Sequence, residues 1–127
     1  MAEYECIGKK LTHSFSKEIH AKLADYAYDL IDLAAEEIAP SFEKKDFAAI
    51  NVTIPYKQTV IPYLDSISEV AERIGAVNTI VNKDGKLCGY NTEYYGMKAL
   101  IERIGIDLTG KKVLVLGTGG TSKTARV

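Results

Sequence analysis

Two serines, Ser14 and Ser16, have the right chemistry and spacing to bind an acidic group of a ligand. They stand just before a segment with helical spacing of apolar residues, and the first turn of a helix leaves backbone amides without partners. Hydroxyl groups together with such amides can hold a carboxylate. Serine is also a common helix cap, so capping alone is the simpler interpretation of these two residues by themselves.

A lysine and a carboxylate at two other expected helix starts are candidates for moving a proton. Thr53 and Lys57 flank Pro55, a residue typical of a first helical turn, where the helix dipole favours a neutral amine. Glu93 stands in another expected first turn, where the same dipole favours the ionised carboxylate. The ordinary alternatives are a solvated lysine, a helix-end carboxylate and, for Asn78, a simple turn residue.

A glycine cluster near the carboxyl end indicates nucleotide chemistry. The apolar run Lys112–Leu116 leads directly into Gly117, Gly119 and Gly120. A buried parallel strand that ends in such glycines is how a dinucleotide-binding domain turns into its first helix. The residue that reads the ribose would lie about 20 positions later, which is beyond Val127. We therefore expect only the start of such a domain here.

The elements that must position these residues alternate between strand and helix. Short apolar runs predict strands at Tyr4–Gly8, Tyr28–Leu33, Ala48–Ile54, Val77–Val81 and Lys86–Tyr90. Helices are predicted after Ser16 (with Ile19, Leu23 and Ala27 as its apolar positions), at Ala35–Lys45 around Pro40, at 56–64, at 66–74 ending at Gly75, and at Glu93–Ile104, where Thr92 is the expected cap.

This order of elements predicts an α/β fold. The Asp84-Gly85 pair between two strands is a strong hairpin signal, so those two strands should be antiparallel neighbours. We expect residues 1–106 to form a three-layer sandwich with a mixed, mostly parallel sheet. Residues 107–127 are expected to add the first strand and glycine loop of a truncated Rossmann domain.

Charge and composition exclude several classes of partner. Sixteen basic and seventeen acidic residues give a net charge of −1, without the basic stripe that attracts nucleic acid or anionic membranes. The amino terminus has no signal-peptide pattern, and no apolar run approaches the roughly 18 residues of a membrane span, so we expect a cytoplasmic protein. Cys6 and Cys88 have no histidine or cysteine at ligand spacing, so we expect core thiols and no metal site.

Taken together and in order, five segments closely resemble the shikimate dehydrogenase family. They are Lys10–Ser16, Asn51–Lys57, Gly75–Thr79, Gly89–Glu93 and Gly117–Gly120. The resemblance implies a substrate domain followed by a cofactor domain, with a cleft between them. It also implies reversible, NADPH-dependent reduction of 3-dehydroshikimate to shikimate in aromatic amino-acid biosynthesis.

The resemblance assigns a role to each candidate residue. Ser14 and Ser16 would hold the substrate carboxylate, while Thr53 and Asn78 would contact the ring hydroxyls. Lys57 would be catalytic, donating or accepting the proton of the reacting oxygen, with the residue at position 93 as its carboxylate partner. The loop for the NADP pyrophosphate would begin at three glycines, Gly117, Gly119 and Gly120.

Two departures from the family pattern matter. The family has aspartate where this chain has Glu93, and a displacement near 1 Å in a catalytic site can cost about a hundredfold in rate. Most of the cofactor domain is missing, so we expect the 127-residue chain alone to bind substrate at most.

Two alternatives are a quinate/shikimate dehydrogenase that uses NAD and a non-catalytic binding or assembly module. In the second, the apolar strand Lys112–Leu116 would pair with a partner chain, which could be a second copy.

Overall fold

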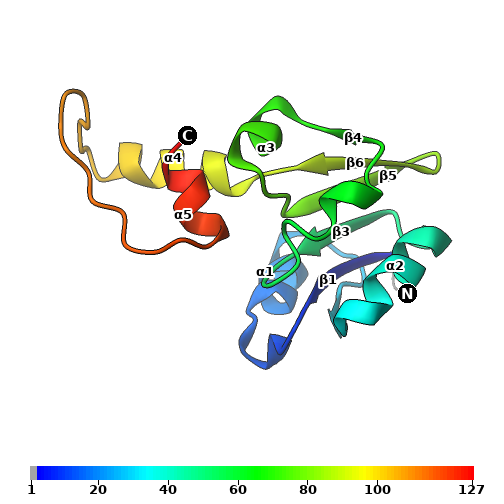
Figure 1. Ribbon diagram of the computed structural model, residues 1–127. Coiled ribbons are helices and arrows are strands. Elements are labelled where there is room, and N and C mark those ends of the chain that lie inside the picture. Colours follow the sequence, from blue (N-terminus) through cyan, green and yellow to red (C-terminus); the bar gives the residue numbers. More distant parts are fainter. Residues whose placement is uncertain (1–2) are drawn as a thin grey trace.

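The computed structural model describes residues 3–127, and it contains a six-stranded sheet with helices on both faces (Figure 1). The strands are β1 (Tyr4–Gly8), β2 (Asp29–Asp32), β3 (Ala49–Val52), β4 (Ser66–Ile67), β5 (Thr79–Lys83) and β6 (Lys86–Tyr90). The helices are η1 (Leu11–His13), α1 (Ser16–Leu23), α2 (Ala35–Lys44), η2 (Ile61–Tyr63), α3 (Glu69–Ile74), α4 (Glu93–Arg103) and α5 (Gly120–Ala125), of which η1 and η2 are 3-10 helices.

The strand order is β2-β1-β3-β5-β6-β4, which confirms a mixed and mostly parallel sheet. The pairs β1–β2, β1–β3 and β4–β6 are parallel, whereas β3–β5 and β5–β6 are antiparallel. In this register the carboxyl ends of β1, β3 and β6 lie beside the amino end of β5, at the same end of the strands. The segments that follow or precede those ends carry the candidate site residues, so the topology alone brings them together.

The two faces of the sheet differ in chemistry. Ile50 pairs with Ile80, and Ile7 pairs with Val52, so these four side chains share one face and are buried there. Side chains from α2 and α3 complete this core. On the opposite face, Cys6 pairs with Asn51, and α1 lies over this more polar surface.

The helix predicted at 56–64 is wrong. Residues 54–60 form successive turns, and only Ile61–Tyr63 winds into the short helix η2. Pro62 has no N–H to donate and is tolerated only at the start of a helix. The buried Tyr56 is held instead by its hydroxyl, which donates to the Leu33 carbonyl at 2.6 Å.

The helix predicted at 66–74 is shorter than expected. Ser66–Ile67 is the edge strand β4, paired with β6, and the helix begins only at Glu69. The Ser68 hydroxyl caps it by accepting a hydrogen bond from the Ala71 N–H at 3.2 Å. The end of this helix is as predicted, because Gly75 adopts a left-handed conformation with φ 71° and donates to the Ala71 carbonyl.

Helix α1 departs from the prediction in its cap and in its exposed face. The cap position is Phe15 rather than Ser16, and Ser16 is the first helical residue. Ile19 and Leu23 are 53% and 72% exposed, so the apolar spacing does not mark the packed face. Ser16 and His20, four residues apart, face the sheet instead.

The carboxyl-terminal segment shows the largest difference from expectation. Helix α4 extends away from the sheet, and the chain then makes a long excursion before α5 returns to pack against α4 (Figure 1). Lys112–Leu116 forms no strand, and Leu114 and Leu116 are 82% and 86% exposed. A strand needs a hydrogen-bonded neighbour, and none of the segments described at 3–127 pairs with this one. Self-association through Lys112–Leu116 stays a prediction, as does a domain boundary near residue 106.

The predicted hairpin is confirmed, and the two cysteines differ. Asp84 and Gly85 have φ values of 53° and 83° between the antiparallel strands β5 and β6, as a tight hairpin turn requires. Cys6 is buried, whereas Cys88 is only partly buried.

Within residues 3–127, no helix has the length and apolar character that crossing a membrane demands.

Candidate functional site

Lys57 and Glu93 form a direct ion pair at the end of the sheet where the carboxyl ends of β3 and β6 lie. The Lys57 amine donates to Oε1 of Glu93, across 36 residues of sequence. Only 12% of the Lys57 side chain and 30% of the Glu93 side chain are exposed, so solvent screens the pair weakly. The other carboxylate oxygen, Oε2, is buried and accepts no hydrogen bond from the described residues.

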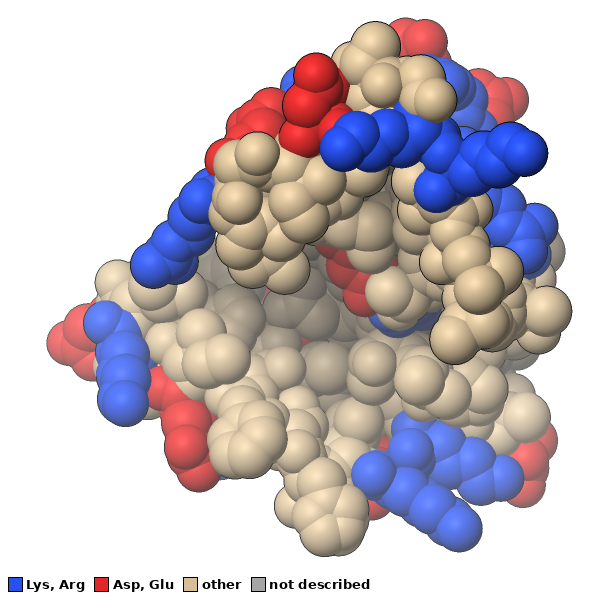
Figure 2. Space-filling model, turned by 90° about the vertical axis from the view of Figure 1, so that its left-hand side faces the viewer, with Lys and Arg blue, Asp and Glu red and all other residues tan. Residues whose placement is uncertain are grey.

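This ion pair lies in a pocket of about 260 Å³ between α1 and the strand ends. Figure 2 shows that this face of the molecule is hollowed, with charged side chains deep in the hollow and mostly uncharged residues around it. The side chains lining the pocket come from every segment that meets at this edge. They are Cys6, Ser16, His20, Asn51, Val52, Thr53, Lys57, Asn78 and Glu93.

The structure brings together most of the substrate residues predicted from sequence. Ser16, Thr53 and Asn78 line the pocket with the ion pair. Ser14 does not line it, because its hydroxyl accepts a hydrogen bond from the Ser16 N–H at 3.3 Å and so supports the start of α1. The capping interpretation therefore describes Ser14, and Ser16 carries the hydroxyl that faces the pocket.

The predicted dipole environment of Lys57 is wrong, since no helix begins at residues 55–57. Lys57 instead lies in a turn that follows β3, and its carbonyl accepts a hydrogen bond from the Val77 N–H at 2.8 Å. This bond ties the lysine segment to the residues before β5. The position of Lys57 therefore depends on the sheet and not on a local helix.

Asn78 is more than a turn residue. Its Oδ1 accepts the Thr92 N–H at 2.9 Å, and its Nδ2 donates to the Thr92 hydroxyl at 2.9 Å. These two bonds hold the segment before α4 against the start of β5. They place Glu93, the next residue, beside Lys57.

Asn91 is a positioning residue for which the sequence predicted no role. It is 1% exposed; its Nδ2 donates to the Ala76 carbonyl at 3.0 Å, and its Oδ1 accepts the Glu93 N–H at 3.1 Å. Asn91 therefore caps α4, a role that Thr92 was predicted to have but whose side chain makes no capping bond. Asparagine is at least as common a cap as threonine, so residue type alone does not distinguish the two positions.

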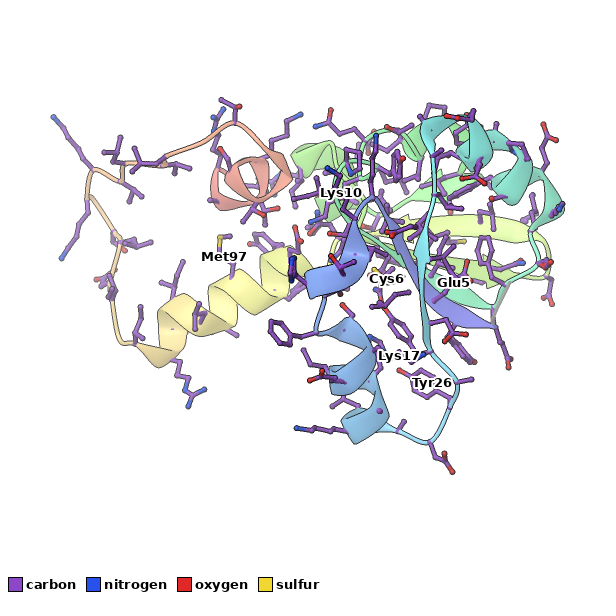
Figure 3. The ribbon with its side chains drawn as sticks, turned by 90° about the horizontal axis from the view of Figure 1, so that it is seen from below. Glu5, Cys6, Lys10, Lys17, Tyr26 and Met97 are labelled. Atoms are coloured by element: carbon purple, nitrogen blue, oxygen red, sulfur yellow. The ribbon has the colours of Figure 1, made fainter. Side chains whose placement is uncertain are left out.

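Cys6, His20 and Asn51 also line the pocket, although the sequence predicted no role for them there. Figure 3 shows Cys6 on the side of the sheet where α1 lies. Burial raises the pKa of the Cys6 thiol, so this wall of the pocket is uncharged at neutral pH. The signal that could have found His20 is its spacing of four from Ser16, which places both on one face of α1.

The glycine loop lies next to the same lysine. A second cavity of about 440 Å³ is bounded by Lys57 and its neighbours on one side and by Gly119 and Gly120 on the other. Gly117 has φ 126°, a conformation that favours glycine, and a Cβ at Gly120 would lie 3.4 Å from Cδ of Lys57. Lys57 thus separates the pocket from the glycine loop.

No group of three or more His, Cys, Asp or Glu side chains in residues 3–127 is arranged to hold a metal ion.

Comparison with known proteins agrees with this geometry. Residues 6–80 match the family described as the shikimate dehydrogenase substrate binding domain. The chain belongs to this family. Shikimate dehydrogenase (NADP+) from Clostridium perfringens (strain SM101 / Type A) is 43% identical over 132 residues, which cover 98% of this chain and 49% of that protein.

Solved shikimate dehydrogenases have the same fold. Shikimate dehydrogenase 1 from Peptoclostridium difficile superposes with a TM-score of 0.92 at 40% identity, covering 99% of this chain and 50% of that one. The Thermus thermophilus enzyme in complex with NADP(H) and shikimate gives a TM-score of 0.81 at 31% identity, covering 98% and 50%. The chain therefore spans about half the length of the relatives it matches.

Proposed function

We propose that this chain forms the shikimate-binding site of an NADP-dependent shikimate dehydrogenase, which interconverts 3-dehydroshikimate and shikimate. The observation that carries the proposal is the pocket in which Ser16, Thr53 and Asn78 surround the Lys57–Glu93 ion pair. A hydroxylated ring acid needs donors for its carboxylate and paired donors and acceptors for its hydroxyls. This pocket offers both.

The lining suggests how the substrate is oriented. The Ser16 hydroxyl at the start of α1 is the donor for the carboxylate, because the free amides of the first helical turn lie beside it. Thr53 and Asn78, at the opposite side, contact ring hydroxyls. The uncharged wall formed by Cys6 packs against the ring.

Lys57 is the group that donates or accepts the proton of the reacting oxygen. Glu93 holds the amine in place through Oε1. Although the family pattern has aspartate at this position, the longer Glu93 side chain reaches Lys57 directly, which supports retention of the pair. The two titrations are coupled, so they belong to the pair and not to either residue.

NADP, when bound, supplies or accepts the hydride. Gly117, Gly119 and Gly120 are the residues of this chain that would hold its pyrophosphate, since a loop without side chains lets the backbone approach closely. The left-handed conformation of Gly117 and the cavity that this loop shares with Lys57 support this assignment. Residues 107–127 are accordingly proposed to begin the cofactor domain and residues 1–106 to form the substrate domain.

Calorimetric titration with shikimate tests the proposal. We expect one molecule of shikimate to bind per chain, and the uncharged methyl ester of shikimate to bind more weakly because it lacks the carboxylate charge. Lys57→Met should weaken binding at least about tenfold, since it removes a charge-assisted hydrogen bond from the pocket. Lys22→Met, on the exposed end of α1, is the matched control and should bind like the parent chain. Absence of a binding signal from the parent chain would refute the proposal.

A further inference from the structure

A continuous run of hydrogen bonds links Tyr28, which lies behind the pocket, to Thr92, which precedes Glu93. The Tyr28 hydroxyl donates to Oδ1 of Asn51 at 2.7 Å, and Nδ2 of Asn51 donates to the Thr79 hydroxyl at 3.2 Å. The Thr79 hydroxyl then donates to Oδ1 of Asn78 at 3.2 Å, and Asn78 bonds to Thr92. We call this series, Tyr28 to Asn51 to Thr79 to Asn78 to Thr92, the polar relay.

Backbone groups fix the orientation of the two amides in the polar relay. Nδ2 of Asn51 faces the carbonyl oxygen of Asn78 at 3.4 Å, which can only accept, so Oδ1 of Asn51 must face Tyr28. The Thr92 N–H can only donate, so the atom of Asn78 that receives it must be Oδ1. With both amides fixed, the Tyr28 hydroxyl has to act as donor and the relay has one direction.

The surroundings of Tyr28 keep its hydroxyl in that role. Tyr28 is 6% exposed and its ring stacks on the His20 ring, with centroids 3.8 Å apart and planes 8° apart. Burial, reinforced by the neighbouring Cys6, raises the pKa of the Tyr28 hydroxyl, although the Ser16 hydroxyl partly opposes this. The phenol is therefore protonated at neutral pH.

We propose that Tyr28 is a positioning residue for substrate recognition, which acts through Asn51 and Thr79 on the carboxamide of Asn78. This inference rests on the proposed shikimate-binding function and adds a residue outside the pocket lining to it. Asn78 has two jobs, since it ties down the segment before Glu93 and contributes to the pocket lining. Without the Tyr28 hydroxyl, Oδ1 of Asn51 loses its donor, and the Asn51 amide is held on its Nδ2 side alone, by Thr79 and the Asn78 carbonyl.

A neighbouring tyrosine provides a matched control. Tyr26 belongs to the same aromatic cluster and its hydroxyl pairs with Nδ1 of His20, but within residues 3–127 that hydroxyl bonds to no member of the polar relay. Tyr28→Phe and Tyr26→Phe therefore delete the same atom from two adjacent rings. Only the first deletion breaks the relay.

The experiment measures shikimate affinity and the side-chain amide signals of Asn78 by NMR in both variants. We expect Tyr28→Phe to weaken shikimate binding about three- to tenfold, the size of one lost hydrogen bond, and to shift the Asn78 side-chain signals in the free chain. We expect Tyr26→Phe to leave the Asn78 side-chain signals unchanged, because its hydroxyl pairs with His20 and not with the relay. Equal effects of the two variants on Asn78, or an unchanged affinity and unchanged Asn78 signals in Tyr28→Phe, would overturn the inference.

A second break in the relay guards against a trivial loss of folding. Thr79→Val keeps the Tyr28–Asn51 bond but removes the hydroxyl between Asn51 and Asn78, so it should give the same loss of affinity. Because both changes interrupt one series, the double variant should lose little more than either single variant, whereas additive losses would contradict the relay. If the parent chain binds no shikimate, the proposed function fails, and the Asn78 signals of Tyr28→Phe alone then decide whether the relay exists.

Discussion

The Lys57 amine and the Glu93 carboxylate are paired directly although the strands that precede them, β3 and β6, are not neighbours in the sheet. Lys57 lies in the turn after β3, and Glu93 begins the helix that follows β6. Both strands run antiparallel to β5, which lies between them. The register places the carboxyl ends of these strands on either side of the start of β5. The pair thus depends on the mixed character of the sheet.

Replacing the carboxylate should affect stability as well as binding. Glu93→Gln keeps the shape but removes the charge, so we expect a loss of about 1–2 kcal/mol in the free energy of unfolding. Glu93→Asp keeps the charge but withdraws it by about 1.5 Å, one bond length, and should lose less. Urea unfolding of the three chains measures this order. Equal stability of all three would show that the pair contributes nothing to the fold.

Two glycines make opposite predictions for the same substitution. A Cβ at Gly8 would lie 2.6 Å from Cγ2 of Thr53 and 3.1 Å from the Ile54 carbonyl oxygen, so Gly8→Ala should destabilise by about 1–3 kcal/mol and displace Thr53. Gly96 lies inside α4 with open space around it, so Gly96→Ala should stabilise by about 0.5–1 kcal/mol. Thermal unfolding with shikimate titration checks both, and a neutral Gly8→Ala would contradict the close approach seen at the end of β1.

Asn91 makes a prediction about the start of α4. Asn91→Ala removes both the cap of this helix and the donor to the buried Ala76 carbonyl, so we expect a loss of about 2–3 kcal/mol in the free energy of unfolding. Asn91→Asp retains the capping acceptor but loses the donor, and it should recover part of that stability. The measurement is chemical unfolding. Indistinguishable curves for parent and Asn91→Ala would exclude the positioning role.

The half-exposed carboxylate of Asp65 contributes to the pH dependence of stability. The Leu87 N–H donates to Oδ2 of Asp65 at 2.7 Å, and this bond lowers the pKa of Asp65 from its ordinary 3.8. A depressed folded-state pKa stabilises the fold above the unfolded-state value, and this contribution disappears as the pH falls through the lower folded value.

Asp65→Asn removes that titration while keeping an acceptor for Leu87. We therefore expect the melting temperature of the parent chain to exceed that of Asp65→Asn above about pH 4–5, and the difference to shrink towards pH 2. Melting curves at a series of pH values test this. A difference that stays constant from pH 2 to pH 7 would show that Asp65 is not the titrating group.

Most of the sheet could be predicted from sequence because its strands are short apolar runs bounded by turn residues. The hairpin was predictable for a local reason, since Asp84-Gly85 supplies two residues that adopt positive φ. The pocket residues could be named through the family resemblance, which specifies them by motif. Their convergence depends on the strand order, which is known only from the structure of the folded sheet.

The misses share a cause, because tertiary contacts overrode a local pattern. Ile19 and Leu23 have helical spacing, yet the packed face of α1 is set by His20 stacking on Tyr28. Lys112–Leu116 is an apolar run, but β structure requires a paired neighbour. The polar relay from Tyr28 to Thr92 was equally invisible, since its members are far apart in the sequence and only the register of β3 and β5 aligns them.

The most direct test of the shikimate site is an NMR titration of the chain with shikimate that follows every backbone amide. We expect saturable shifts clustered at Ser16, Thr53, Lys57, Asn78 and Glu93. Lys45 and Gly85, at the opposite end of the strands, should change little. Shifts confined to other surfaces, or none at saturating shikimate, would contradict a shikimate site in this pocket.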